Sequence, residues 1–175
     1  ANWCALEGDS RNSPQCDDST DFGWIMHGLW PQYDRGFPAS CRTSERPPSC
    51  QQTEAMADIM GTSGLAWYQW NKHGVCAGLP ADDYYALARE AYSRVTRPDV
   101  FRKLDKTVTL PASLIEDAFI KDNPDMPRDG ITITCKQGYI QEARICLTRY
   151  LDFRTCGADV IRDCSLSSAQ FAPMR

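Results

Sequence analysis

The chain has 175 residues, of which 42% are hydrophobic and five are tryptophan, so it can bury a sizeable core. Its formal net charge of −4 excludes the overall basic surface that many stoichiometric nucleic-acid binders carry. That charge does not exclude an enzyme that holds a few nucleotides and releases them. We therefore expect one domain, residues 1–175, with no disordered composition.

Nine cysteines is a high number for a chain of this length, and no C-x-x-C pair suggests a redox or metal motif. A disulfide framework formed in an oxidising compartment is the favoured interpretation. The odd count leaves at least one thiol free or paired with another chain. With no recognisable signal peptide, we expect a mature secreted or periplasmic protein. No apolar run approaches the roughly 18 residues of a membrane span, so no membrane association is expected.

The first half of the chain predicts loops followed by helices. We expect residues 1–53 to form loops with short extended pieces, and Thr53 to cap a short helix, Glu54–Met60. A longer helix is expected in DDYYALAREAYSRV, capped by Asp82 or Asp83. Its apolar residues recur at helical spacing: Tyr84, Leu87, Ala88, Ala91, Tyr92 and Val95.

The second half predicts one more helix and then strands. Pro98 prevents the preceding helix from continuing, and Pro111 suits the first turn of a helix in PASLIEDAFIKDN that stops before Pro124. The segments ITITC, 131–135, and ARICL, 143–147, are typical of strands. Helices in the middle of the chain with strands around them indicate an α+β fold. One face of the third helix is apolar: Leu114, Ile115, Ala118 and Phe119.

Two histidines are the main candidates for chemistry: His27 in GWIMHGLWPQ and His73 in WYQWNKHGVC. Each is followed by glycine, which lets backbone or ligand approach the imidazole, and each has aromatic neighbours that favour a partly dry pocket. A hydrogen-bonded structural histidine is the alternative for either position. If the two imidazoles face one another across a cleft, one can remove a proton while the other donates one, and their usual pKa allows this at mildly acidic pH.

Lys72 adds a positive charge directly before His73. That charge lowers the histidine pKa and attracts an anion. Two histidines and a lysine without a metal motif suit phosphoryl transfer within RNA, where the 2′-hydroxyl attacks the adjacent phosphorus. DNA has no such nucleophile, so we expect no cleavage of DNA.

HGLWP (27–31) and WNKHGVC (70–76) closely resemble the two active-site segments of the ribonuclease T2 family, which comprises secreted, periplasmic or vacuolar acid endoribonucleases. The resemblance is to a bacterial-type member. It implies an α+β fold with a central antiparallel sheet, helices packed on it and stabilising disulfides. It also implies a monomer that needs no cofactor or metal. The implied reaction cleaves single-stranded RNA to a 2′,3′-cyclic phosphate, which is then hydrolysed to a 3′-phosphate.

The resemblance also implies roles for individual residues. His73 corresponds to the general base that activates the 2′-hydroxyl, and His27 to the general acid that protonates the departing 5′-oxygen. Lys72 corresponds to the group that stabilises the pentacovalent phosphate. Trp30 corresponds to the residue that stacks on the base.

Two further positions in the first segment match the family less closely. Phe37 lies about where a second aromatic residue sandwiches the base, with spacing one residue shorter, and plain core packing is its alternative. Gln32 follows HGLWP where many eukaryotic members have aspartate, so its position carries over but base specificity does not.

The second segment departs from the family pattern H-E-W-x-K-H-G-x-C at two positions. Tyr68 replaces a histidine that helps to bind phosphate, and its hydroxyl can still donate a hydrogen bond. Gln69 replaces the catalytic glutamate, which orients the base histidine or polarises Lys72. We expect reduced but not abolished catalysis, and the alternative is a weakened module that binds RNA or protein. In addition, the family's usual first strand is absent before Cys4.

Disulfide pairing is likewise implied by the resemblance and not by spacing. The expected bridges are Cys4–Cys16, Cys41–Cys76, Cys135–Cys164 and Cys146–Cys156, with Cys50 as the free thiol. The second bridge would join the two active-site segments. A zinc site of histidine and cysteine is an alternative, although no ligand pair has the usual close spacing. A further alternative is a disulfide-rich structural protein with incidental histidines.

Overall fold

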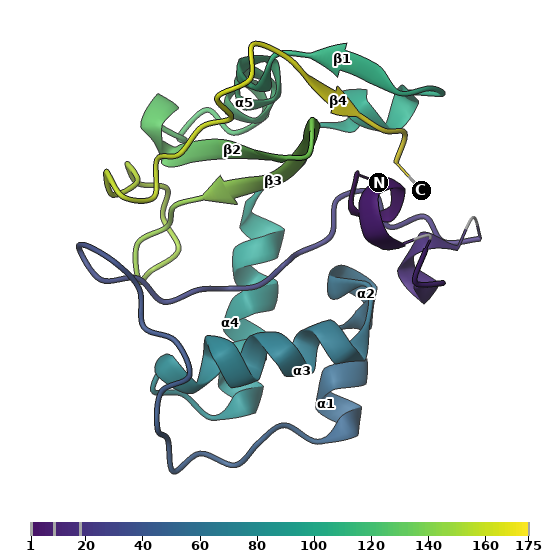
Figure 1. Cartoon of the computed structure of the whole chain (residues 1–175). Helices are drawn as coiled ribbons and strands as arrows, with labels where there is room; N and C mark the ends of the chain where they lie inside the picture. Colours follow the sequence, from purple (N-terminus) through teal and green to yellow (C-terminus); the bar gives the residue numbers. More distant parts are fainter. Residues whose placement is uncertain (1, 9, 18, 175) are drawn as a thin grey trace. The chain divides into compact units, whose positions relative to one another are not determined.

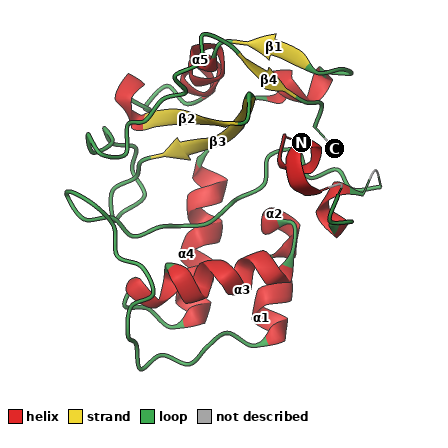
Figure 2. Ribbon diagram, in the orientation of Figure 1, coloured by secondary structure: helices red, strands yellow, loops and turns green. Residues whose placement is uncertain are grey.

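The computed structural model describes residues 2–8, 10–17 and 19–174. The chain forms two compact units, which are described separately. Unit 1 contains the residues up to 23 and those from 95 onward, and unit 2 is Trp24–Arg94. Unit 1 carries a sheet and unit 2 is built from helices and long loops (Figure 1, Figure 2). The expected α+β class is confirmed.

Unit 2 has four α-helices and a short 3₁₀ turn among its elements. The helices pack around a core whose largest member is Trp70, which is 1% exposed and contacts the rings of Tyr84 and Tyr85. Burial of these aromatic side chains stabilises this unit. The elements are α1 (Cys50–Glu54), α2 (Ala57–Met60), α3 (Ser63–Lys72), η3 (Gly74–Cys76) and α4 (Ala81–Arg94). The core residues are Met56, Ile59, Met60, Ala66, Trp70, Ala81, Tyr84, Tyr85 and Ala88.

The expected single helix Glu54–Met60 is wrong, because the chain forms α1 and α2 instead. The cap is Ser49, whose hydroxyl accepts from the backbone of Gln52, while the Gln52 side chain accepts from the backbone of Ser49. This capping box starts the helix upstream of Thr53. The Thr53 hydroxyl instead donates to the carbonyl oxygen of Cys50 inside α1.

Helix α3 was not expected from the sequence, and it carries the first three residues of the segment WNKHGVC, Trp70–Lys72. Thr62 caps it by accepting a hydrogen bond from the backbone of Leu65 at 3.1 Å. The expected helix after residue 81 is confirmed as α4, which begins at Ala81. Asp82 and Asp83 therefore lie in its first turn, where carboxylates favour the helix dipole, and not at the cap position.

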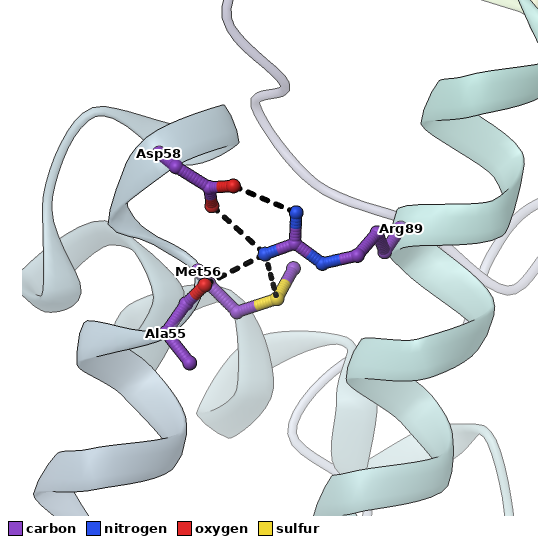
Figure 3. Close-up of polar contacts among 4 residues, drawn as sticks. All are labelled: Ala55, Met56, Asp58 and Arg89. Atoms are coloured by element: carbon purple, nitrogen blue, oxygen red, sulfur yellow. Dashed lines mark hydrogen bonds and ion pairs between the residues drawn. The ribbon is translucent and has the colours of Figure 1, made fainter.

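Arg89 of α4 joins that helix to the junction of α1 and α2 (Figure 3). Its guanidinium donates two 2.8 Å hydrogen bonds to the carboxylate of Asp58 and one of 2.6 Å to the carbonyl oxygen of Ala55. The Met56 sulfur lies 3.8 Å from the same guanidinium. Because the ion pair is solvent-exposed it contributes little by itself, and the bond to Ala55 closes the end of α1.

Unit 1 contains the sheet, one α-helix and several short helical turns. Helix α5 packs on strand β2 (Figure 2). The α-helix begins after Pro111, which is extended and precedes the first turn, and ends at Asp122, with Asn123 as its C-cap. The elements are η1 (Cys4–Gly8), η2 (Pro14–Cys16), η4 (Asp99–Lys103), β1 (Val108–Leu110), α5 (Ala112–Asp122), η5 (Arg128–Gly130), β2 (Ile131–Lys136), β3 (Tyr139–Ile145) and β4 (Ala169–Phe171).

The sheet has the order β1-β4-β3-β2 and is mixed. The pairs β1–β4 and β2–β3 are antiparallel, whereas β3 and β4 pair in parallel at Tyr139 and Gln170. The two expected strands are present, but β3 begins earlier than residue 143. Gln137 and Gly138, with φ of 51° and 84°, form the two-residue turn that starts the hairpin at Tyr139.

The cysteines form four disulfides: Cys4–Cys16, Cys41–Cys76, Cys135–Cys164 and Cys146–Cys156. These are the pairs that the family resemblance implies, and Cys50 is free and exposed. In the described residues before 17, the turns η1 and η2 form where loops were expected, and they carry the two ends of the first bridge. Within the described ranges, no helix is long and apolar enough to cross a bilayer.

Candidate active site

The two segments that resemble the family's active-site segments, HGLWP and WNKHGVC, both lie in unit 2. His27 lies in an irregular loop that precedes α1, and hydrogen bonds to helices on both sides of His27 fix this loop. The backbone N–H of Met26 donates to the carbonyl oxygen of Ile59 at 2.7 Å. The hydroxyl of Tyr84 donates to the carbonyl oxygen of Leu29 at 2.8 Å. His27 itself is exposed. The loop therefore holds an exposed imidazole on a backbone anchored to α2 and α4.

His73 is the residue at which α3 ends. Its backbone N–H donates to the carbonyl oxygen of Gln69 at 2.8 Å, and its own carbonyl oxygen accepts from Cys76 at 3.0 Å. The next residue must be small, because a Cβ on Gly74 would lie 2.5 Å from the Trp70 side chain and 3.1 Å from that of Tyr84. The glycine after this histidine is therefore explained by close packing on the core.

The chain after the first segment is attached directly to the end of α3. Cys41 and Cys76 form a disulfide, and the Cys41 N–H lies 3.2 Å from the Cys76 sulfur. One residue earlier, the N–H of Ser40 donates to the carbonyl oxygen of Lys72 at 2.7 Å. These bonds fix the loop that follows HGLWP beside the two residues Lys72 and His73.

The structure brings His27 and His73 to the same aromatic ring. The indole of Trp30 meets His27 edge-on, with ring centroids 5.3 Å apart and an interplanar angle of 73°. It lies 5.2 Å from the His73 ring at a tilt of 32°. Phe37, which is 57% exposed, lies 6.2 Å from His73. Four of the predicted residues thus form one cluster of rings: His27, Trp30, Phe37 and His73.

Gln69 is the buried polar residue at the centre of this cluster. Its side chain is 1% exposed, and its Oε1 accepts a 2.7 Å hydrogen bond from Nε1 of Trp30. Gly28 lies directly against this bond, because a Cβ there would be 2.7 Å from Trp30 Nε1 and 2.9 Å from Gln69 Cδ. The amide therefore faces Trp30, whereas the sequence suggested His73 or Lys72 as its partner.

Burial is the main influence on the charge of His73. The residue is 5% exposed, and its Nδ1 is buried without a hydrogen-bond partner in the described parts of the chain. Burial, the positive charge of Lys72 and the nearby His27 together lower the pKa of His73 to about 4. The carbonyl end of α3 favours an imidazolium, but burial outweighs that effect. The His73 ring is therefore neutral above about pH 4, as a base requires.

The remaining candidate residues lie toward solvent. Tyr68 is 53% exposed on α3, and the Lys72 ammonium lies 5.7 Å from the centre of its ring, which is cation–π distance. Gln32 is exposed on the loop after Pro31. In the described ranges, no three histidine, cysteine, aspartate or glutamate side chains group to hold a metal ion.

Sequence reasoning missed Tyr84 as a residue that builds the site, and it gave Gly28 and Gly74 a different role, the approach of backbone or ligand to the imidazoles. Tyr84 anchors the loop of His27 from α4, and Gly28 and Gly74 allow the close packing around Gln69 and Trp70. The spacing of Ala66, Gln69, Trp70 and His73, which is that of one helix face, could have revealed α3. Two polar side chains on this face concealed its apolar period.

The model of the Ribonuclease T2 family matches residues 1–156 of the chain. A ribonuclease of Aeromonas hydrophila is 38% identical over 87 residues, which are 50% of this chain and 38% of that protein. A probable ribonuclease of Haemophilus influenzae is 32% identical over 95 residues, covering 49% of this chain and 33% of that protein. The chain thus spans less than two-fifths of the length of these relatives.

Solved structures of low sequence identity share the fold. An RNase-related protein from Calystegia sepium superposes with a TM-score of 0.72 at 15% identity, covering 90% of this chain and 86% of that one. RNase NT, solved in complex with 5′-AMP, superposes with a TM-score of 0.60 at 20% identity, and the match covers 93% of this chain and 94% of that one. Ribonuclease MC1 from bitter gourd seeds superposes with a TM-score of 0.61 at 15% identity, and the match covers 85% of this chain and 83% of that one.

Proposed function

The chain belongs to the ribonuclease T2 family, and on this premise we propose that it is an endoribonuclease that cleaves single-stranded RNA. The observation that carries the proposal is the contact of one indole, Trp30, with both imidazoles, at 5.3 Å from His27 and 5.2 Å from His73. Two imidazoles held this close can serve one phosphodiester as acid and base.

In the proposed first step, His73 takes the proton of the 2′-hydroxyl. The 2′-oxygen then forms a bond to the adjacent phosphorus, and the bond from phosphorus to the 5′-oxygen breaks as His27 protonates that oxygen. The product is a 2′,3′-cyclic phosphate. In the slower second step water opens the ring to a 3′-phosphate, with the two histidines exchanging roles. No metal or cofactor takes part, and DNA, which lacks the 2′-hydroxyl, is not cleaved.

The buried position of His73 favours one ring nitrogen for this proton transfer. Nδ1 is enclosed by protein, so Nε2 is the nitrogen that a 2′-hydroxyl can reach. A neutral ring with a free Nε2 carries its proton on Nδ1. The pKa of His73, lowered to about 4, keeps the ring in this neutral form at weakly acidic pH.

Lys72 and Tyr68 are proposed to bind the reacting phosphate. Lys72 supplies positive charge where the oxygens of the pentacovalent phosphorus gain negative charge, and such stabilisation is often the largest catalytic contribution. The Tyr68 ring beside the ammonium holds Lys72 on this face of α3, and its hydroxyl can donate to a phosphate oxygen.

The base is proposed to bind near Trp30 and Phe37, with Gln32 as a polar neighbour. Phe37 is exposed and lies 6.2 Å from the His73 ring, so its free face can take a stacked base next to the scissile phosphate. The nucleotide 5′-AMP in the complex of RNase NT supports nucleotide binding by this fold.

Gln69 in place of a carboxylate is proposed to reduce the rate without abolishing it, because both histidines and Lys72 remain. The second candidate function is a weakened module that binds RNA or protein. The buried amide of Gln69 is the observation that favours it, since an amide cannot take up a proton.

The four disulfides fit an oxidising compartment. We propose that the protein is secreted or periplasmic and acts as a monomer. Size-exclusion chromatography coupled to light scattering would test the monomer, and a mass of two copies would contradict it.

The proposed activity is tested with single-stranded RNA at about pH 5 in the presence of EDTA, with DNA of matched sequence alongside. We expect RNA fragments with 2′,3′-cyclic phosphate ends and intact DNA. The matched variants His27→Ala and His73→Ala should lose the activity, whereas Trp67→Phe, on the exposed side of α3, should retain it. RNA binding without cleavage would favour the second function, and cleavage of DNA would contradict the mechanism.

A further inference from the structure

We infer that Gln69 is a positioning residue that acts on both histidines through the indole of Trp30. The inference rests on the proposed function, because it gives those histidines their catalytic roles. It assigns Gln69 no contact with substrate and no proton transfer. The side chain instead fixes the ring against which both imidazoles pack.

The direction of the hydrogen bond between the two side chains is unambiguous. An indole Nε1–H can only donate, so the atom of Gln69 that faces it at 2.7 Å must be the amide oxygen. The Gln69 side chain is 1% exposed, so water cannot replace this acceptor without entering the core. Loss of the acceptor would remove this hydrogen bond from a buried site and would favour rotation of the Trp30 ring.

The imidazole of His73 depends on packing for its orientation. Its Nδ1 makes no hydrogen bond within the described parts of the chain, although many catalytic histidines are oriented by such a bond. The rings in contact with it are Trp30, at 5.2 Å, and Phe37, at 6.2 Å, and Phe37 is 57% exposed. The Trp30 indole, held by its hydrogen bond to Gln69, is therefore the contact that sets the angle of the His73 ring.

The same indole meets His27 edge-on at 5.3 Å, so a rotation of Trp30 moves both imidazoles together. Proton transfer is sensitive to such displacement, and an error of about 1 Å can cost about 100-fold in rate. Loss of the hydrogen bond should therefore lower kcat more than it raises KM.

Gly28 provides a way to disturb the bond without changing either partner. A Cβ at this position would overlap Gln69 Oε1 and would lie 2.7 Å from Trp30 Nε1. Gly28→Ala should therefore separate donor and acceptor. Gly64→Ala is the matched control, because outside the backbone of its own helix the nearest atom to a Cβ there is the Thr62 hydroxyl oxygen, at 4.0 Å.

The experiment combines kinetics on a dinucleotide substrate with proton NMR of the imidazole C–H signals, of which the chain has two sets. Gln69→Leu and Gly28→Ala retain the indole, so any change in the pH midpoint or line width of the histidine signals reports the ring's position. Gln69→Glu retains an acceptor and is the conservative rescue. Gln51→Leu, on the exposed side of α1, controls for the substitution of glutamine by leucine.

We expect Gln69→Leu and Gly28→Ala to lower kcat by about 10- to 100-fold, with changed titration of both histidines and a shifted Trp30 indole N–H signal. Gln69→Glu should keep that indole signal bonded. Trp30→Phe removes the donor, so adding Gln69→Leu to it should cause little further loss. The controls should leave both readouts unchanged.

Three outcomes would overturn the inference: a rate loss in Gln69→Leu with unaltered histidine titrations, fully additive losses in the double variant, or unaltered kinetics and titrations in Gly28→Ala. The proposed function fails separately, if the unmodified protein does not cleave RNA at all. In that case altered histidine titrations in Gln69→Leu would still support positioning by Gln69.

Discussion

The hydroxyl of Tyr84, on helix α4, donates a 2.8 Å hydrogen bond to the carbonyl oxygen of Leu29, two residues after His27. The Tyr84 side chain is 1% exposed, and burial raises its pKa well above the usual range, so the hydroxyl remains a donor at any working pH. A core aromatic residue of α4 thereby fixes the backbone of the loop that carries the proposed general acid.

Tyr84→Phe should remove that bond and leave the Leu29 carbonyl without its donor. We expect a loss of about 1–2 kcal/mol in the free energy of unfolding and a lower kcat, because the His27 loop gains freedom. Urea unfolding and RNA-cleavage kinetics measure the two effects. Tyr85→Phe is the matched control. The Tyr85 hydroxyl donates to the carbonyl oxygen of Ala66 inside the helical core, so its loss should lower stability and leave kcat unchanged. An equal loss of kcat in both variants would contradict the proposed anchoring.

The Cys41–Cys76 bridge should stabilise unit 2 and hold its two active-site segments together. Its ends are 35 residues apart, for which restriction of the unfolded chain predicts roughly 3–4 kcal/mol. A double variant, Cys41→Ser with Cys76→Ser, should lose that stability and most activity. Cys50→Ser, which changes the free exposed thiol, should change neither. Full activity of the double variant in urea-free buffer would show that the bridge does not position the histidines.

The rate should remain high to lower pH than a histidine of usual pKa would allow. Because His73 must be neutral to act as base and its pKa is lowered to about 4, the acidic limb of kcat/KM should fall near pH 4. Gln69→Glu places a carboxylate in the same buried cluster, which should raise the His73 pKa and move this limb to higher pH. A pH–rate profile of both proteins on a dinucleotide substrate tests this, and coincident acidic limbs would contradict it.

Stability should also follow the lowered pKa of His73. The unfolded chain binds a proton at this residue near pH 6.5, whereas the folded protein does so near pH 4, so the contribution is complete above about 6.5 and is lost as pH falls toward 4. The loss amounts to roughly 3 kcal/mol. Urea unfolding between pH 4 and 7 should show a smaller pH dependence in His73→Leu. If the free energy of unfolding of His73→Leu varied with pH as in the unmodified protein, the pH dependence would come from groups other than His73.

Glu116 of α5 should have the opposite effect in unit 1. Burial and the neighbouring Asp163 raise its pKa, against the backbone N–H of Ile133 and the charge of Arg128. A raised pKa in the folded state favours stability at low pH, and that contribution is lost as pH rises through it. Glu116→Gln, which keeps the shape, should therefore reduce the decline in stability between pH 4 and 7. A steeper decline in this variant would contradict the assignment.

The helices with uninterrupted apolar faces were predictable from sequence. The stripe from Tyr84 to Val95 gave α4 almost to the residue, and the proline at 111 marked the start of α5. The split of the first helix was not predictable from Thr53, because two caps compete there and the reciprocal bonds of Ser49 and Gln52 are stronger. Strand β4 is three residues long and depends on pairing with β1, which local sequence does not encode.

For the site, sequence motifs located the residues but not their partners. The two segments predicted that His27, His73 and Lys72 belong together, and the structure places the two histidines on one indole. The partner of Gln69 could not be inferred, since an amide can bond to several neighbours and the choice depends on packing 39 residues away at Trp30. The closeness of Gly28 to that bond likewise follows from tertiary packing.

The free thiol of Cys50 has a consequence for how the chain oxidises. Cys50 lies between Cys41 and Cys76 in sequence, so a wrong bridge from Cys50 to Cys76 would close a shorter loop than the native one and would be entropically easier by roughly 0.3 kcal/mol. Random oxidation therefore slightly favours the mispaired chain. In the folded protein the Ser49 capping box places Cys50 in the first turn of α1 with its thiol exposed, so native structure in this helix opposes the mispaired bridge.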